Sequence, residues 1–328
     1  AQVCAALRQR NVQFFLGIVA IAALLRLSYL DLIEFKADEA QHLLRSARLV
    51  ESGEWPLVGT MASVGIAKPP LMVYLMAIPL LLGRDPRVAS GFIALLNVAA
   101  VGGLFLLVRR YYGLRPAAIS TLLLAVNPWA VAYSRKVFTA DLLLPFALVF
   151  LWGLLRALVD RRPWGWVSAC LSLGLSLYLT FSPVPILLAF LALIVIYRGR
   201  VSWAHLVFGI SLTILVFVPY LYYWNMNGMD GLVAALRSLR GASDDVMPAS
   251  KAVILPFQYA SWLHSGHHYS SLAGASIREF APLRSIFAPL TGVQVLIFLA
   301  SLGSTAILAV RSWSRWREQE DAARYVIL

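Results

Sequence analysis

Six charged residues, gathered in three short segments, have the types and spacing for acid–base and phosphate chemistry. They are Asp38, Glu39, Lys68, Arg135, Lys136 and Asp141. A carboxylate can act as a general base, and a fixed cation can stabilise a phosphate. Two prolines follow Lys68 and fix the start of the next helix, so we expect this cation to be held rigidly at a helix start. The simpler interpretations are helix capping for the Asp-Glu pair and a snorkelling lysine for Lys68.

The composition indicates that lipid, rather than water, surrounds much of the chain. Of its 328 residues, 60% are hydrophobic and 13% are charged, whereas soluble domains carry roughly 25% charged residues. Apolar stretches long enough to cross a bilayer recur along the sequence. The net charge of +12 is explained by cytoplasmic loops and by contact with anionic membrane lipids, so nucleic acid is not a predicted partner. The two cysteines, Cys4 and Cys170, do not indicate a disulfide framework.

These stretches predict an all-α integral membrane protein with about eight transmembrane helices. The candidate spans are 11–30, 88–108, 116–134, 141–159, 164–181, 183–197, 203–223 and 290–310. The apolar stretch Pro69–Leu82 is short, and we expect that it does not cross. The basic pairs Arg109-Arg110 and Arg161-Arg162 then lie on the side of the N-terminus, as the positive-inside rule requires. This arrangement predicts a multi-pass plasma-membrane protein with both termini in the cytoplasm.

The first outer loop, 31–87, is long, and its start has helical periodicity. We expect an amphipathic helix from Ala37 to about Ser52, lying in the membrane interface. Its apolar stripe is predicted to hold Ala40, Leu43, Leu44, Ala47 and Val50. Asp38, His42 and Arg45 are predicted to lie on the opposite, polar side of this helix.

The order of these features resembles one superfamily of membrane enzymes. An Asp-Glu pair after the first span is followed by Lys-Pro-Pro-Leu at 68–71, by Asn-Pro at 127–128 with a following Ser-Arg, and by an Asp at the start of a span. Together, over roughly residues 15–160, they resemble the dolichyl-phosphate-mannose protein mannosyltransferases, which include the bacterial aminoarabinose transferases acting on lipid A. The resemblance implies a GT-C-like bundle with interfacial helices. It also implies transfer of a sugar from a polyprenyl-phosphate donor to an acceptor on the outer membrane face.

The resemblance assigns roles to matching positions. It implies Asp38 as the catalytic base with Glu39 as its neighbour, Asp141 as the second acid, and Lys68 and Arg135 as cations near the donor phosphate. Lys136 is suited to the same task. We expect a one-step displacement with inversion, in which the cations stabilise the leaving phosphate. Because no Gly-rich nucleotide loop occurs, a nucleotide-sugar donor is disfavoured.

A metal site receives little support from the sequence. Some relatives place a metal-binding glutamate directly before the lysine, whereas this chain has Ala67 there. His264, His267 and His268 are weak metal candidates in the second long outer loop, and scattered surface histidines are the simpler interpretation. We therefore predict no cofactor with certainty and keep a divalent metal as the alternative.

We expect three regions along the chain. Residues 1–223 form a transmembrane catalytic module, 224–289 form an outer loop that could act as a lid, and 290–328 hold the last span and a cytoplasmic tail. The chain begins with Ala1, and Tyr325–Leu328 resembles the opening of another span, so we expect missing sequence at the ends.

Two other functions compete with the transferase. One is a transporter or flippase of lipid-linked sugars, and the other is a non-catalytic membrane subunit of a larger complex. Transporters usually carry ionisable residues near the bilayer midplane in repeated halves, whereas here mid-span charges are nearly absent. Arg26, near the outer end of the first span, is expected to snorkel.

Overall fold

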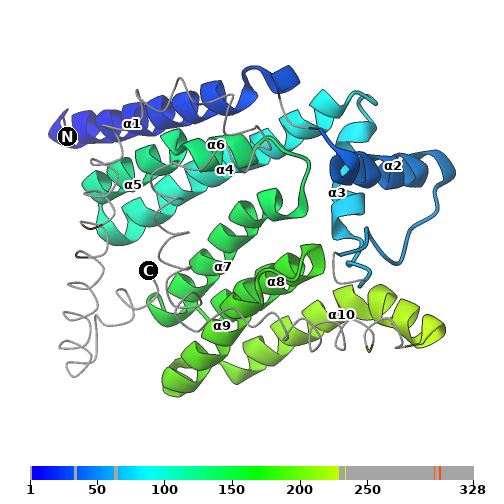
Figure 1. The fold of residues 1–328 in the computed structure, drawn as a ribbon. Coiled ribbons are helices and arrows are strands. Elements are labelled where there is room, and N and C mark those ends of the chain that lie inside the picture. The colour runs from blue at the N-terminus through cyan, green and yellow to red at the C-terminus, as the bar shows by residue number, and fades with distance from the viewer. Residues whose placement is uncertain are drawn as a thin grey trace. The chain divides into compact units, whose positions relative to one another are not determined.

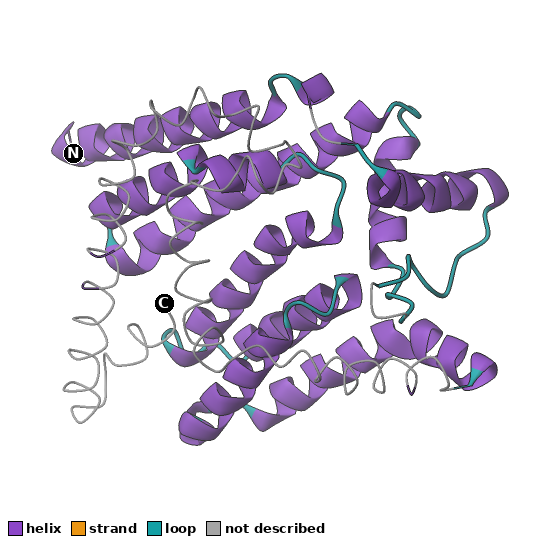
Figure 2. Cartoon of the chain, in the orientation of Figure 1, coloured by secondary structure: helices purple, strands orange, loops and turns teal. Residues whose placement is uncertain are grey.

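A computed structural model describes residues 2–32, 35–62 and 66–228, with the single positions 233, 299 and 303, and shows side chains from Val12 onward. The chain divides into two compact units, Ala1–Val126 with Ala132–Gly241, and Asn127–Val131 with Ala242–Leu328. All the candidate residues in the described part of the chain belong to the first unit. Within the described residues the regular elements are helices (Figure 2). One isolated β-bridge pairs Met61 with Ala67.

The helices follow one another closely along the chain (Figure 1). They are α1 (Gln2–Leu27), α2 (Ala37–Ser52), α3 (Leu71–Leu80), α4 (Pro86–Tyr112), α5 (Leu114–Val126), α6 (Pro128–Tyr133), α7 (Leu143–Leu158), α8 (Trp164–Leu179), α9 (Val184–Ile196) and α10 (Trp203–Asn227). Three short 3-10 helices are η1 (Leu30–Leu32), η2 (Thr139–Leu142) and η3 (Arg198–Arg200).

The helical segments confirm an all-α membrane protein. Among the described residues, three helical segments are long and apolar enough to cross a bilayer, namely Pro86–Tyr112, Thr139–Leu158 and Trp203–Asn227, and five shorter apolar helices accompany them. Every predicted span up to residue 223 coincides with helix, although the predicted span 116–134 is interrupted at Asn127, before the proline that opens α6. The predicted span 290–310 lies outside the described residues.

Small residues let α8 approach its neighbours closely. A Cβ atom added to Gly165 would lie 2.5 Å from the main-chain nitrogen of Ala157 and 2.5 Å from the carbonyl oxygen of Gly153 on α7. On the side of α10, a Cβ atom on Gly209 would lie 2.9 Å from Cβ of Cys170. Helices in lipid associate mainly through such close van der Waals packing, because no hydrophobic force drives them together. α8 is therefore packed backbone to backbone against α7, and closely against α10 (Figure 1).

The prediction that Arg26 snorkels is wrong. Arg26 is fully buried, where α1 packs against α4 and α5. Its guanidinium donates hydrogen bonds to the carbonyl oxygens of Ala125 (2.8 Å) and Leu124 (3.1 Å). The last carbonyls of a helix have no partner within the helix and carry partial negative charge. The carbonyl groups at the end of α5 therefore supply the hydrogen bonds that water and lipid headgroups would otherwise give to Arg26.

The predicted helix at 37–52 is present as α2, but its buried face differs from the predicted apolar stripe. The buried residues are Glu39, His42, Leu43, Ser46 and Leu49, whereas Leu44 is 60% exposed and Val50 is 37% exposed. The prediction that His42 lies on the polar side of the helix is wrong, because His42 is buried. The helix is rotated because its polar Glu39 has an ion-pair partner inside the protein.

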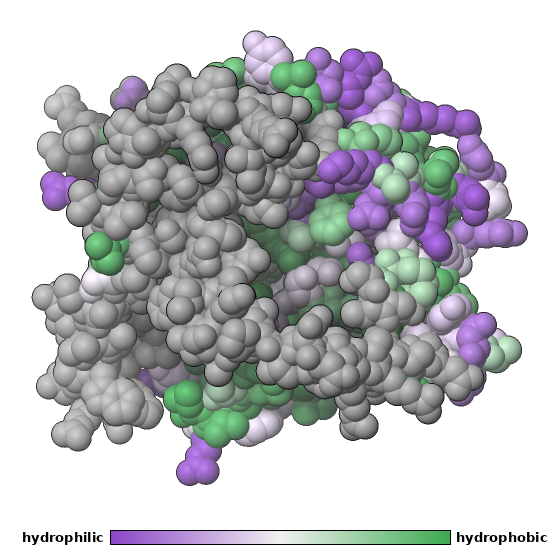
Figure 3. Space-filling model, viewed as in Figure 1, coloured by the Kyte–Doolittle hydropathy of each residue, from purple (hydrophilic) through white to green (hydrophobic). Residues whose placement is uncertain are grey.

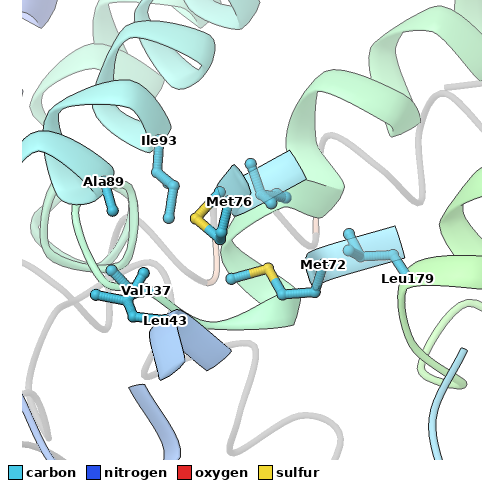
Figure 4. Close-up of a cluster of buried hydrophobic side chains, with 8 residues drawn as sticks. Leu43, Met72, Met76, Ala89, Ile93, Val137 and Leu179 are labelled. Atoms are coloured by element: carbon cyan, nitrogen blue, oxygen red, sulfur yellow. The ribbon is translucent and has the colours of Figure 1, made fainter. Parts of the chain in front are cut away.

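An apolar cluster joins the segments that carry the candidate residues (Figure 4). Its members come from α2, α3, α4, the loop before η2, η2 itself and the end of α8, and they are Leu43, Met72, Met76, Ala89, Ile93, Val137, Leu142 and Leu179. Met72, Met76 and Ile93 are 0–1% exposed. Because close-packed interiors tolerate little displacement, this cluster fixes the mutual positions of the loops that it joins.

We predict that Gly165→Leu destabilises the protein by about 1–3 kcal/mol or more, because the added side chain would collide with the backbone of α7. Thermal unfolding in detergent, followed by tryptophan fluorescence, measures the change. Gly17→Leu on α1 is the matched control, since a Cβ atom at Gly17 meets nothing within 4 Å. Equal melting temperatures for the two variants would contradict the proposed role of close packing at α8.

Candidate functional site

Glu39 joins the start of α2 to the loop that follows α6. Its Oε2 accepts a hydrogen bond of 2.9 Å from the backbone N–H of Lys36, which caps the helix. Its Oε1 lies 3.1 Å from Nζ of Lys136, and the side chains of Lys136 and Glu39 are 22% and 2% exposed. A buried carboxylate requires such partners. With both oxygens occupied, Glu39 is suited to hold the site together, and the neighbouring Asp38 remains exposed.

Lys68 has a rigid backbone at a helix start, as the sequence predicts. Its N–H donates to the carbonyl oxygen of Thr60 (2.9 Å), and its own carbonyl accepts from the N–H of Gly59 (2.7 Å). The hydroxyl of Tyr220 on α10 donates to the carbonyl oxygen of Ala67 at 2.6 Å. The two prolines after Lys68 lead directly into α3. The position of Lys68 is thus set by three different segments, namely residues 59–60, α10 and the start of α3.

The charge of Lys68 is partly desolvated. Burial lowers the pKa of Lys68 from its usual value, and the nearby carboxylate of Asp38 partly offsets this effect. A cation that has lost part of its hydration attracts an anion more strongly than an exposed one. Asp38 and Lys68 therefore place a carboxylate and a partly buried cation in one electrostatic neighbourhood.

The loop from Ser134 to Asp141 contributes a second cation and an aromatic ring. The Nζ atoms of Lys68 and Lys136 lie 5.5 Å and 5.8 Å from the ring centroid of Phe138. Distances below about 6 Å are typical of cation–π contacts. Phe138 thus contacts both lysines, and the sequence analysis did not single it out.

Asp141 lies at the inner end of this loop. It is 7% exposed, and its carbonyl oxygen accepts a hydrogen bond of 3.0 Å from Nδ2 of Asn97 on α4. Among the described residues, Oδ2 of Asp141 has no hydrogen-bond partner. Lys136 and Glu39 are the charged groups that act on it. Sequence reasoning also missed Asn97, although a polar residue inside an apolar span was a signal available to it.

Arg135 points to a different place. Its Nη1 donates a hydrogen bond of 2.8 Å to the carbonyl oxygen of Ser28, just after α1. The positive charge of Arg135 lies near that of Arg26, and the two charges repel each other. The structure therefore brings Asp38, Glu39, Lys68, Lys136 and Asp141 together, and it places Arg135 beside the end of α1.

His42 lies one helical turn after Asp38 on the buried face of α2. It is 1% exposed, and its Nδ1 has no hydrogen-bond partner in the described part of the chain. Burial, with a smaller effect of Lys68, lowers the pKa of His42 to about 4. Its imidazole is therefore neutral at pH 7.

No group of three or more His, Cys, Asp or Glu residues suited to a metal ion occurs in the residues that the structure describes. The candidates His264, His267 and His268 lie outside those residues. A divalent metal thus remains an alternative on sequence grounds alone.

We predict that acid destabilises the protein through His42. The folded-state pKa of about 4 lies below the usual value of about 6.5, so the unfolded chain binds the proton more readily and stability falls as the pH drops through this interval. The loss is about 2 kcal/mol between pH 7 and pH 5. Melting temperatures in detergent at both pH values measure it.

His42→Gln should flatten this pH dependence. Ser46→Ala is the matched control, because it alters a buried polar residue one turn further along α2 and removes no titratable group. Parallel pH profiles for the parent and His42→Gln would exclude His42 as the source of the acid effect.

Hydrophilic residues gather on the visible surface around α2, the element whose first turn holds Asp38 and Glu39 (Figure 3).

Residues 67–223 match the family model described as dolichyl-phosphate-mannose-protein mannosyltransferase. No curated protein matches the chain.

Two solved structures share the fold, both of ArnT from Cupriavidus metallidurans. The structure bound to undecaprenyl phosphate has 20% sequence identity and a TM-score of 0.51, and the match covers 68% of this chain and 42% of that chain. The apo structure has 18% identity and a TM-score of 0.51, with coverage of 70% and 43%. The chain thus spans less than half the length of these proteins. The family model matches a little under half of the chain, and the chain shares the membrane fold of these two structures.

Proposed function

We propose that this chain carries the membrane-embedded donor site of a glycosyltransferase that moves a sugar from a polyprenyl-phosphate carrier to a hydroxyl acceptor. The observation that carries the proposal is the exposed carboxylate of Asp38 beside the partly buried cation of Lys68. Lys136, a second partly buried cation, contacts the same aromatic ring as Lys68. The GT-C fold supports it. So does the undecaprenyl phosphate in one of the ArnT structures, which shows that the same fold can bind such a carrier.

In the proposed reaction, the acceptor hydroxyl attacks the anomeric carbon of the sugar. Asp38 takes the proton from the hydroxyl, and the bond between the anomeric carbon and the phosphate oxygen breaks. The electron pair of this bond leaves with the carrier phosphate, whose negative charge increases. Because attack and departure occur on opposite faces of the carbon, the configuration inverts.

The charged groups have separate tasks in this scheme. Lys68 and Lys136 stabilise the leaving phosphate, since fixed cations aimed at a developing charge lower the barrier. Glu39 holds Lys136 in place through its buried ion pair. Asp141 orients the acceptor or the base. Arg135 would act on the phosphate only after leaving the carbonyl of Ser28.

The proposed site faces the outer side of the plasma membrane, with the N-terminus in the cytoplasm. The bias of basic loops toward the cytoplasm supports this topology. The partners are then the membrane lipids, a lipid-linked sugar donor and a hydroxyl acceptor on a protein, lipid or glycan.

We predict that Lys68→Met weakens binding of undecaprenyl phosphate by at least about 10-fold, because a desolvated cation beside phosphate is worth more than about 1.4 kcal/mol. Native mass spectrometry of the purified protein, titrated with the lipid, measures binding. Arg84→Met is the matched control, since it removes a cation from an exposed ion pair with Glu51 in the same outer loop. Absence of binding by the parent would favour the transporter or the inactive subunit.

Asp38→Asn tests the base. We expect it to retain lipid binding while transfer falls by about 100-fold or more, because general-base catalysis contributes roughly this factor. The assay adds membranes that supply the acceptor to the purified protein. It then measures the loss of the glycosylated carrier that copurified with the protein. Unchanged turnover by Asp38→Asn would remove Asp38 from the mechanism.

A further inference from the structure

One aromatic ring contacts two cations that come from different parts of the chain. The Nζ atom of Lys68 lies 5.5 Å from the ring centroid of Phe138, and the Nζ atom of Lys136 lies 5.8 Å from it. Lys68 precedes α3, and Lys136 lies two residues before Phe138. The ring contacts both ammonium groups.

The ring offers something that a carboxylate cannot. Two ammonium groups repel each other, and the repulsion grows where the dielectric constant is low. A carboxylate would relieve this repulsion by neutralising charge and would also repel a phosphate. The face of an aromatic ring attracts cations through its quadrupole and carries no net charge. A phenylalanine can therefore contact two lysines without adding negative charge of its own, so the ring does not repel an anion that binds them.

The backbone around Phe138 is fixed. Its N–H donates to the carbonyl oxygen of Lys136 (3.0 Å), and its carbonyl accepts from the N–H of Asp141 (3.1 Å). The preceding Val137 is 1% exposed within the apolar cluster. Asn97 anchors the other end of the segment through the carbonyl of Asp141. The ring thus has a defined position from which to set the positions of flexible lysine side chains.

We propose that Phe138 is a positioning residue that directs Lys68 and Lys136 toward one phosphate group, that of the lipid carrier. This role rests on the proposed function, because it requires that the two lysines bind a phosphate. Phe138 itself does not touch the reacting atoms. By restricting the two lysine side chains before binding, Phe138 lowers the conformational entropy that they lose when the phosphate binds.

The test measures undecaprenyl phosphate binding to the purified full chain by native mass spectrometry. Phe138→Leu keeps an apolar side chain and removes the ring, and we expect the dissociation constant to rise by about 5- to 30-fold for two lost cation–π contacts. Phe138→Tyr keeps the ring, and we expect it to stay within about 3-fold of the parent. Phe146→Leu is the matched control, because it removes a ring that packs against the neighbouring apolar cluster, and we expect it to leave binding unchanged.

A second comparison separates positioning from packing. In a Lys68→Met background, Phe138→Leu should have a smaller effect, since one of the two contacts is already absent, whereas a packing defect would lower affinity by the same factor in both backgrounds. Equal binding by Phe138→Leu and the parent, loss of binding in Phe138→Tyr, or equal factors in both backgrounds would each overturn this role and leave the proposed function standing. Failure of the parent to bind the lipid would overturn both.

Discussion

The buried ion pair between Glu39 and Lys136 is the interaction on which the rest of the site depends. It connects the first turn of α2 with a loop about a hundred residues later, and one of its partners is almost completely buried. Removing either partner would leave an uncompensated charge inside the protein. The pair therefore decides which face of α2 turns inward, and with it the exposure of Asp38 and the burial of His42.

Apolar packing supplies the rigidity that this pair needs. The cluster around Met72, Met76 and Ile93 lies where α3, α4 and the loop before η2 meet. The close contact of α8 with α7 and α10 supports the same region from the other side, because Tyr220 of α10 reaches the backbone next to Lys68. Charged groups can hold defined positions near lipid only when such a scaffold prevents their escape to water.

The helices were predictable from the sequence, because runs of apolar residues report burial in lipid or protein without regard to neighbours. The grouping of Asp38, Lys68 and Lys136 could be inferred only through their order and the superfamily resemblance. The site roles remain proposals. The orientation of α2 was mispredicted, since periodicity weighs apolar residues and ignores a distant lysine that stabilises a buried glutamate. Arg26 was mispredicted because its partners are distant backbone carbonyl groups. Every residue has a carbonyl group, so the sequence does not mark which ones will accept from Arg26. Phe138 gave no local pattern that distinguished it from the residues around it, whereas Asn97 was marked as a polar residue inside an apolar span.

The location of Arg26 also constrains the order in which the protein is built. Its carbonyl partners belong to a helix that is synthesised later, with 99 positions separating Arg26 from Ala125. Until that helix exists, the guanidinium of Arg26 lacks these two carbonyl acceptors, and water or headgroups must take their place. The first helix can therefore complete the hydrogen bonding of Arg26 only after α5 has been synthesised.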